Sequence, residues 1–283
     1  MKKRLLLASD FDGTVGVGGQ LEKDRAAIAR FRAQGHLFGL VSGRNAAGLK
    51  EMRKKTDLPC DFLLSDNGSV CYLPKKGEKG QDPFAFEENS AHFDPFCGGK
   101  LLFYHAGAEE LFFPLADFLL ECGSQMVAVN DHNGAELLYL EEDGSLSVNL
   151  PRESWIARPF SQMSGLFERT EDAHAAAREG EKRFPGLVGL VSDCLDFLPR
   201  GRDKAVGILE LAALLGVKEE DIFTVGDNFN DLAMLRAFRG FAVENAPKEV
   251  KMQAKEGEIP TLSHLIDLLL SKDCVNEKEN RHE

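Results

Sequence analysis

The sequence predicts an α/β protein with a parallel sheet in its core and a second, smaller α/β unit inserted into that core. Short apolar segments that suit buried strands alternate with longer segments of helical periodicity, the pattern of a parallel sheet flanked by helices. A polar stretch rich in turn-forming residues, at positions 74–83, marks a domain boundary. With 283 residues, the chain suits two domains better than one. We therefore expect a core formed by residues 1–82 and 189–283, and an inserted domain formed by residues 83–188.

The composition excludes several classes of protein. Hydrophobic residues make up 43% and charged residues 28%, as in an ordinary globular chain rather than a disordered or fibrous one. The net charge of −12 argues against binding to nucleic acid or to an anionic membrane, because basic surface drives both. The 6 cysteines include no Cys-x-x-Cys pair, so we expect neither a zinc site nor a disulfide framework. The apolar run near the N-terminus is too short for a signal peptide, and we find no membrane span, so we expect a cytoplasmic protein.

The first predicted strand, residues 5–9, ends directly in two carboxylates, Asp10 and Asp12, followed by Gly13. Because strand side chains alternate with a period of two, both carboxylates can project to one side at the carboxyl end of the sheet, where open α/β folds bind ligands. Two adjacent carboxylates repel unless a cation separates them or one holds a proton, so the pair suggests a divalent metal. A plain acidic turn after a strand is the alternative.

The second predicted strand ends in small and polar residues. Residues 22–34 are predicted to form a helix and residues 36–41 a buried strand, which Ser42, Gly43 and Arg44 follow ahead of a further helix. A hydroxyl and two backbone N–H groups at a helix start suit a phosphoryl oxygen, because helix N-termini present unpaired donors. The pattern leaves open whether Ser42 binds phosphate or only caps the helix.

A third predicted strand, residues 61–65, closes with an Asp-Asn-Gly turn, and residues 69–73 return as a hairpin arm. Turn chemistry explains Asn67 in this position. A contact between Asn67 and a substrate is the alternative.

The inserted domain has no obvious catalytic cluster. His132 lies in a polar loop between two predicted strands, and we interpret it as a loop residue or a specificity element rather than a catalytic one. The predicted elements are a helix ending near Cys122, strands at 125–129, 135–142 and 159–166, a helix at 172–184, and strands at 187–191 and 195–199.

Lys204 lies at the start of an amphipathic helix where the chain returns to the core. A cation at a helix start opposes the helix dipole, so a purely structural choice would disfavour lysine there, and a functional explanation is favoured. Arg202 is the competing cation, although the helix register favours Lys204.

The last chemical motif is Gly226-Asp227-Asn228-Phe229-Asn230-Asp231, which follows a buried strand predicted at residues 221–225. Two carboxylates four residues apart, Asp227 and Asp231, can face one ion from a strand end and a helix start. Calcium-binding loops use similar ladders of Asp and Asn, but their spacing and terminal Glu are absent here.

These motifs, in this order, resemble the four signatures of the haloacid dehalogenase superfamily. The first is the run from residue 10 to residue 14, the second Ser42, the third Lys204, and the fourth Gly-Asp followed by Asn-Asp at residues 226–231. The Ser-Gly-Arg triplet and the sheet-containing insertion are similar to the Cof-like, type IIB sugar-phosphatase branch. The resemblance implies a Rossmann-like core with a parallel sheet and an inserted α/β cap domain of the C2B type. Two positions depart from the pattern, since Asp203 stands where Ser or Thr is common and Glu244 where Gly is usual.

The resemblance also implies a chemistry, the hydrolysis of phosphomonoesters with Mg2+ as cofactor. Asp10 would be the nucleophile that forms an aspartyl phosphate, and Asp12 the general acid and base. Nearby carboxylates and burial beneath the closed cap would have to favour the protonated form of Asp12. The implied metal ligands are Asp10, Asp12 through its backbone carbonyl, Asp227 and, in the outer shell, Asp231. The implied phosphate-binding residues are Ser42, Gly43, Arg44, Lys204 and Asn230.

Two other functions share parts of this pattern. A phosphosugar mutase uses the same nucleophile and acid, but the Ser-Gly-Arg triplet and the Cof-like layout favour hydrolysis. A non-catalytic phospho-aspartate signalling module also combines acidic residues with Ser or Thr and Lys around magnesium, but its phosphorylated Asp ends the third strand. The expected partner is a small phosphomonoester such as a sugar phosphate, and we expect no nucleic acid or membrane partner. We expect a monomer or weak homodimer.

Overall fold

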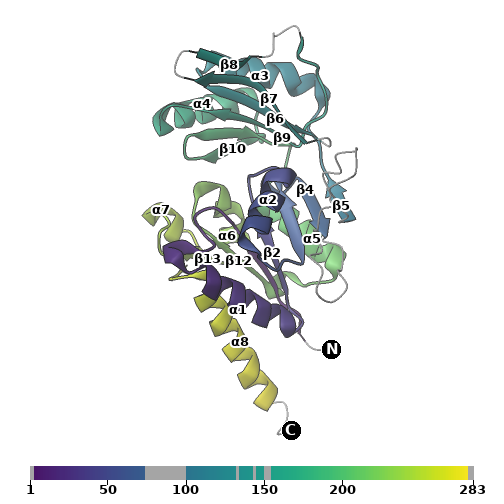
Figure 1. Ribbon diagram of the computed structural model, residues 1–283, viewed down its shortest axis with the longest axis vertical. Helices are drawn as coiled ribbons and strands as arrows, with labels where there is room; N and C mark the ends of the chain where they lie inside the picture. The colour runs from purple at the N-terminus through teal and green to yellow at the C-terminus, as the bar shows by residue number, and fades with distance from the viewer. Residues whose placement is uncertain (1–2, 74–99, 132–133, 143–144, 150–153, 280–283) are drawn as a thin grey trace.

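The structure, a computed structural model, contains two β-sheets with helices packed against each of them (Figure 1). It describes residues 3–73, 100–131, 134–142, 145–149 and 154–279. We call the 8-stranded sheet in the lower part of Figure 1 the core sheet, and the 6-stranded sheet in the upper part the cap sheet.

The core sheet is mainly parallel, with the strand order β14-β13-β12-β1-β2-β3-β4-β5. The strands from β14 to β3 are parallel to their neighbours, whereas β4 and β5 are added antiparallel at one edge. The strands are β1 Leu6–Ser9, β2 Leu37–Val41, β3 Phe62–Ser65, β4 Val70–Leu73, β5 Lys100–Tyr104, β12 Ile222–Gly226, β13 Arg239–Val243 and β14 Glu258–Ile259.

The central strand β1 is buried on both faces, as its continuous apolar sequence predicts. Leu5 and Leu7 join the apolar cluster formed with α1, α2 and α8, whereas Leu6 and Ala8 join the cluster formed with α5 and α6. In Figure 1, α1 and α8 lie side by side, and their residues are in contact. The helices of the core are α1 Leu21–Ala33, α2 Ala46–Thr56, α5 Lys204–Leu215, α6 Leu232–Ala237, α7 Lys248–Lys251 and α8 Leu262–Glu279.

Parallel pairing brings the functional strand ends together. In register, Ser9 of β1 is opposite Leu40 of β2 on one side and Val225 of β12 on the other. The residues that follow these three strands therefore lie along one edge of the core sheet, the position at which open α/β sheets bind ligands.

The cap sheet is antiparallel, with the order β10-β11-β9-β6-β7-β8. Its apolar cluster includes Phe112, Phe118, Phe160 and Phe197, which are buried between strands and helices. The elements of this unit are α3 Phe112–Glu121, β6 Met126–Asp131, β7 Gly134–Glu142, β8 Ser145–Asn149, β9 Gln162–Leu166, α4 Thr170–Arg183, β10 Val188–Val191 and β11 Cys194–Phe197. Their arrangement confirms the α/β fold with a second α/β unit inserted in the first.

Sheet membership corrects the expected boundaries at residues 83 and 188. The strand β5, which follows the first boundary, pairs with β4 in the core sheet, and β10 and β11 pair within the cap sheet. The chain changes sheets after β5 and again after β11. The positions at which the chain changes sheets could not be predicted from the sequence. A strand belongs to the sheet with which it pairs, and this pairing is not determined by local sequence. The polar stretch at residues 74–83 that suggested the first boundary lies outside the described residues.

The C-terminal elements β14, α7 and α8 also lie beyond what the motifs predicted. The helix α8 spans 18 residues and packs Leu262, Leu265 and Ile266 into the cluster around β1. Within the described parts of the chain, no helix is both long and apolar enough to cross a membrane.

Candidate active site

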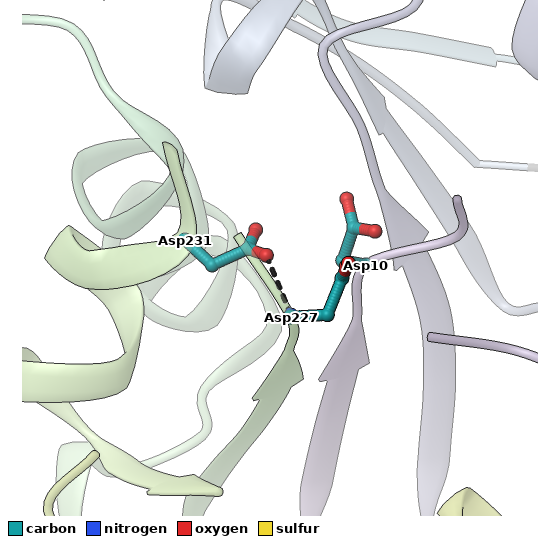
Figure 2. Close-up of side chains that lie close together, drawn as sticks. All are labelled: Asp10, Asp227 and Asp231. Atoms are coloured by element: carbon teal, nitrogen blue, oxygen red, sulfur yellow. Dashed lines mark hydrogen bonds between the residues drawn. The ribbon is translucent and has the colours of Figure 1, made fainter. Parts of the chain in front are cut away.

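Three carboxylates converge at the edge of the core sheet. Asp10 follows β1 and Asp227 follows β12, so the parallel pairing of these strands places the two residues side by side. The Asp10 backbone N–H donates to the carbonyl of Val225 at 2.8 Å, which extends this pairing into the site. Asp231 is the residue before α6. Asp10, Asp227 and Asp231 each offer one oxygen within 4.8 Å of the others (Figure 2).

Lys204 is the cation of this cluster. Its Nζ lies 2.6 Å from Oδ1 of Asp10 and 2.6 Å from Oδ1 of Asp231. The side chain is 0% exposed, so the ammonium has left water for these two carboxylates. A buried charge of this kind is tolerated only when it is paired and hydrogen-bonded.

The start of α5 fixes the position of Lys204. The preceding residue, Asp203, is the N-cap, and its side chain accepts a hydrogen bond from the backbone N–H of Val206 at 2.8 Å. Gly68 allows the helix start to approach closely, since a Cβ there would lie 2.3 Å from the carbonyl oxygen of Asp203. Asp caps helices about as well as Ser or Thr, so Asp203 serves as N-cap at the position where Ser or Thr is common.

The charges in the cluster do not balance, because three carboxylates face one ammonium. Burial raises the pKa of Asp10 to about 8, opposed by Lys204 and reinforced by Asp231 and Asp227. Burial also raises the pKa of Asp227 to about 6, and the charge of Asp231 acts in the same direction. Burial alone would lower the pKa of Lys204, but Asp10 and Asp231 together raise it, so the ammonium keeps its proton. Three carboxylates thus bring more negative charge together than one ammonium balances, so the cluster favours a retained proton on Asp10, which a further cation would displace.

Thr14 links two of the carboxylates. Its hydroxyl donates to Oδ1 of Asp227 at 3.0 Å and approaches Oδ2 of Asp10 at 3.4 Å. Gly13, with φ of +76°, makes room for this contact, because a Cβ there would lie 2.4 Å from Oδ2 of Asp227. Thr14 closes the first sequence motif, and its hydroxyl close to Asp10 and Asp12 in the chain was the signal from which such a contact could have been predicted.

Asp231 holds the loop between β12 and α6. Its Oδ2 accepts hydrogen bonds from the backbone N–H of Asp227 at 2.9 Å, drawn in Figure 2, and from that of Asn228 at 3.0 Å. Since Oδ1 pairs with Lys204, both oxygens of this buried carboxylate are engaged. This geometry suits a residue that organises the site more than one that binds a ligand directly.

Asp12 has surroundings opposite to those of Asp10. Its carboxylate is half-exposed and pairs with Arg44, with Nε 2.6 Å from Oδ2 and Nη2 2.8 Å from Oδ1. The hydrogen bond to Asp12 raises the pKa of Arg44. The expected burial of Asp12 beneath the cap is therefore not observed, and a half-exposed bidentate ion pair takes its place.

Ser42 does not cap α2. The N-cap is Asn45, whose side chain accepts from the backbone N–H of Gly48 at 2.7 Å. The Ser42 hydroxyl oxygen instead accepts from the backbone N–H of Arg44 at 3.1 Å, inside the protein. Of the two open alternatives, the N-cap is wrong, and a phosphate-binding role for Ser42 stays a prediction.

Three residues that the sequence singled out remain: Arg202, Glu244 and His132. Arg202 pairs with Glu210 at 2.8 Å and donates to the carbonyl of Gly68 at 2.7 Å, so Lys204 is the cation that reaches Asp10. Glu244 is exposed. His132 lies outside the described residues.

A second polar cluster, which the sequence did not predict, lies where the cap meets the core. Asn67 connects Asn230 to the cap residues Gln162 and Asp196. Asn130 of β6 donates to Oδ1 of Asp66 at 2.7 Å, which adds a further hydrogen bond across the junction. We call these six residues the junction cluster: Asp66, Asn67, Asn130, Gln162, Asp196 and Asn230.

The oxygen atoms of the carboxylate cluster around Lys204 suit a divalent metal as ligands. Asp10, Asp227 and Asp231 supply only carboxylate oxygens, which hard cations such as Mg2+ and Ca2+ prefer, and not the nitrogen and sulfur ligands typical of zinc. The excess negative charge around Lys204 supports the same conclusion.

Comparison with known proteins agrees with this geometry. A family model described as haloacid dehalogenase-like hydrolase matches residues 7–260. The chain belongs to this hydrolase family. The resemblance inferred from the four sequence motifs is thereby confirmed, and so is the fold that it implied.

The curated relatives of this hydrolase match it over short segments. It is 33% identical over 82 residues to the 5-amino-6-(5-phospho-D-ribitylamino)uracil phosphatase YwtE of Bacillus subtilis, which covers 27% of this chain and 29% of that protein. It is 42% identical over 60 residues to an uncharacterised protein of Geobacillus stearothermophilus, which covers 21% of this chain and 63% of that protein. The matched segments therefore span less than two thirds of either relative.

Solved structures match the hydrolase over nearly its whole length. The subclass IIB sugar phosphatase BT4131 aligns with a TM-score of 0.67 and 18% identity, over 92% of this chain and 94% of that one. BT1666 of Bacteroides thetaiotaomicron aligns with a TM-score of 0.69 and 20% identity, over 95% of both chains. A haloacid dehalogenase-like hydrolase of B. subtilis aligns with a TM-score of 0.71 and 17% identity, over 93% and 98%. At these identities the likeness establishes the fold.

Proposed function

We propose that this hydrolase is a Mg2+-dependent phosphatase that hydrolyses small phosphorylated metabolites, with sugar phosphates as the main class. The observation that carries the proposal is the buried carboxylate of Asp10, held 2.6 Å from the Lys204 ammonium and beside Asp227. A carboxylate fixed in this way is suited to attack phosphorus, because the nearby cation also neutralises charge on the incoming phosphoryl group.

In the proposed reaction, a carboxylate oxygen of Asp10 attacks phosphorus, and the bond from phosphorus to the ester oxygen breaks. Asp12 donates a proton to the departing alcohol. Asp12 then accepts a proton from a water molecule that attacks the aspartyl phosphate, which regenerates Asp10 and releases inorganic phosphate. In the structure Arg44 pairs with the Asp12 carboxylate, and this pair must open before Asp12 can carry the proton that it donates.

The other residues have binding roles in this proposal. Lys204, Ser42, the backbone N–H of Gly43, Arg44 and Asn230 hold the phosphoryl oxygens, whose charge must be neutralised. Asp10 and Asp227, with the backbone carbonyl of Asp12, hold Mg2+, and Asp231 orients the loop that carries Asp227. When bound, the metal supplies charge neutralisation and orientation at the phosphoryl group.

The cap supports a small substrate. Gln162 and Asp196 of the cap bind Asn67, which contacts the proposed phosphate ligand Asn230, so the cap lies close to the proposed phosphate site and limits the size of the substrate. The relative YwtE is named for a phosphorylated ribityl compound, which is consistent with a polyhydroxylated leaving group. We propose sugar phosphates and sugar-alcohol phosphates as the class to test.

We further propose a cytoplasmic monomer or weak homodimer. The described cysteines Cys60, Cys71, Cys122 and Cys194 are free thiols, which suits a reducing compartment. The net charge of −12 supports the absence of nucleic-acid partners. Size-exclusion chromatography with light scattering tests the oligomeric state.

The test of the proposed function is phosphate release from a panel of sugar phosphates, a sugar-alcohol phosphate and a generic aryl phosphate, with and without Mg2+. We compare the wild type with Asp10→Asn and, as a matched control, with Asp57→Asn, which changes an exposed carboxylate. Mg2+-dependent release by the wild type and the control, lost in Asp10→Asn, is the expected result. Transfer of phosphate between positions of one sugar without release would identify a mutase instead, and neither activity would leave the signalling alternative.

A further inference from the structure

The side chain of Asn67 joins the cap to the loop that carries the metal ligands. Its Nδ2 donates to Oδ2 of Asp196 at 2.9 Å and to Oε1 of Gln162 at 3.1 Å, on strands β11 and β9 of the cap. Its Oδ1 accepts a hydrogen bond from Nδ2 of Asn230 at 3.2 Å. Both donors and the acceptor of this buried amide are therefore engaged, two of the contacts with the cap and one with a predicted phosphate-binding residue.

Gln162 connects the cap to a second predicted phosphate-binding residue. Its Nε2 donates to the carbonyl oxygen of Gly43 at 3.0 Å and to the hydroxyl of Ser164 at 3.0 Å. Gly43 itself lies against Asn67, since a Cβ there would be 3.2 Å from the Asn67 amide. A cap side chain therefore holds the peptide group between Gly43 and Arg44. The adjacent peptide group, which carries the Gly43 N–H, is held at its Ser42 carbonyl by the backbone N–H of Asn67.

The backbone that presents Asn67 has an uncommon conformation. Asp66 has a φ of +50° and Asn67 a φ of +48°, in the left-handed region that residues with a Cβ rarely adopt. The backbone N–H of Asn67 donates to the carbonyl of Ser42 at 3.0 Å, and that of Asp66 to the carbonyl of Arg44 at 2.9 Å. These two hydrogen bonds fix the turn to the segment that contains Ser42. Left-handed backbone conformations persist at functional sites when the surrounding structure holds them in this way.

A further contact from the cap reaches the same loop. His174 of α4 packs edge-on against Phe229, with ring centroids 6.5 Å apart. Phe229 directly precedes Asn230, so the cap touches this loop through His174 and, by way of Asn67, through Gln162 and Asp196.

We propose that Asn67 and Gln162 are positioning residues through which the docked cap orients Asn230 and the N–H of Gly43 for phosphate binding. The proposal rests on the proposed function of Gly43 and Asn230 as phosphate ligands. The sequence left open whether Asn67 is a turn residue or contacts the substrate. In this proposal Asn67 does neither alone, because it positions the residues that bind phosphate. Because linkage is reciprocal, phosphate binding and cap docking stabilise each other.

The experiment measures the binding of inorganic phosphate in saturating Mg2+ by calorimetry, and kcat and KM with a generic aryl phosphate. The variants are Gln162→Glu, Asn67→Gly and their combination. Gln162→Glu keeps the size and the acceptor for Asn67 but loses the donor to Gly43, and Asn67→Gly removes the amide from a turn that glycine tolerates. The control is Ser161→Ala, which removes a buried cap hydroxyl that donates only within the cap, to the carbonyl of Asn130.

Each single variant is expected to weaken phosphate binding and raise KM by about tenfold, with a smaller change in kcat, because ground-state and transition-state binding are lost together. The double variant is expected to lose no more than about the larger single effect, since both residues act through one network. The Ser161→Ala control is expected to stay within about twofold of the wild type.

Folded variants that bind phosphate within about twofold of the wild type, as judged with a thermal unfolding control, would overturn the inference. A wild type that binds phosphate but hydrolyses no ester would contradict the proposed function, while the phosphate titrations would still test the inference. A wild type that binds no phosphate in Mg2+ would overturn both. If Asn67→Gly does not fold, Gln162→Glu carries the test alone.

Discussion

The cluster around Lys204 and the junction cluster both bury carboxylates, but they stabilise them in different ways. Around Lys204, Asp10 and Asp231 share one ammonium. In the junction cluster, Asp66 and Asp196 are hydrogen-bonded only to neutral groups in the contacts described, namely hydroxyls, a thiol and side-chain amides.

This difference separates two roles. A cluster with excess negative charge binds a cation and stabilises the transfer of a charged group. A network of amides and carboxylates fixes geometry, because each hydrogen bond has a direction and every unsatisfied group is costly. We therefore expect charge changes to affect the first cluster most, and changes of donor or acceptor to affect the second.

The largest effect is expected from Lys204→Met. Removing the ammonium leaves Asp10 and Asp231 buried without their partner, which should lower the free energy of unfolding by about 3 to 5 kcal/mol and abolish hydrolysis. Urea unfolding and phosphate release measure the two effects. Lys218→Met is the matched control, because the pair that Lys218 forms with Glu220 is exposed and should contribute little. If Lys204→Met loses no more stability and activity than Lys218→Met, the buried ammonium is required for neither.

Mg2+ should stabilise the folded protein through the cluster around Lys204 and not through the junction cluster. At a concentration of about 100 times its dissociation constant, binding to the native state adds about 2.7 kcal/mol, which chelation removes. Asp227→Asn should reduce this stabilisation, whereas Asp196→Asn in the junction cluster should not. Thermal unfolding with and without Mg2+ tests the comparison directly, and equal effects of the two variants would contradict it.

The junction cluster should respond to pH. Burial raises the pKa of Asp66 to about 7 from its ordinary value of 3.8, so the folded state retains a proton that the unfolded state releases. This contribution to stability is complete at low pH and is lost as the pH rises through about 7. From about pH 5 to about pH 8, the stability of the wild type relative to Asp66→Asn should fall by more than about 1 kcal/mol. The exposed variant Asp267→Asn is the control, and a difference independent of pH for Asp66→Asn would be the contrary result.

The smallest effect on stability is expected from Arg44→Ala. The pair of Arg44 with Asp12 is largely exposed, so its loss should cost less than about 1 kcal/mol. If Arg44 binds phosphate as proposed, kcat/KM should still fall by about tenfold or more. Arg25→Ala serves as control for both readouts, because Arg25 is partly exposed and pairs with the exposed Asp57. An unchanged kcat/KM would remove Arg44 from the proposed site.

The sequence predicted the Lys204 cluster because its members lie at ends of regular elements. Asp10 and Asp227 follow buried apolar strands, and parallel pairing of such strands brings their ends together without further information. Lys204 stood out because a lysine at a helix start is unfavourable on structural grounds. The family resemblance then assigned roles to positions that were already candidates.

The junction cluster could not be predicted, because its contacts join distant parts of the chain. Asn67 and Asp196 are 129 positions apart, and nothing local indicates that β9 and β11 place polar side chains against the turn after β3. The same limit explains β5, whose membership of the core sheet depends on pairing with β4. The exposure of Asp12 was missed because alternation along a strand no longer applies beyond Ser9, where β1 ends before the turn that contains Asp12.

The central claim is that the buried carboxylate of Asp10 is the group that accepts phosphate from the substrate. It is tested most directly by quenching the enzyme in acid during turnover of its best substrate with Mg2+ and mapping the added phosphoryl group by mass spectrometry. The account predicts one phosphoryl group on the peptide that contains Asp10, absent in Asp10→Asn. Phosphorylation of a different residue, or turnover by Asp10→Asn at the wild-type rate, would contradict it.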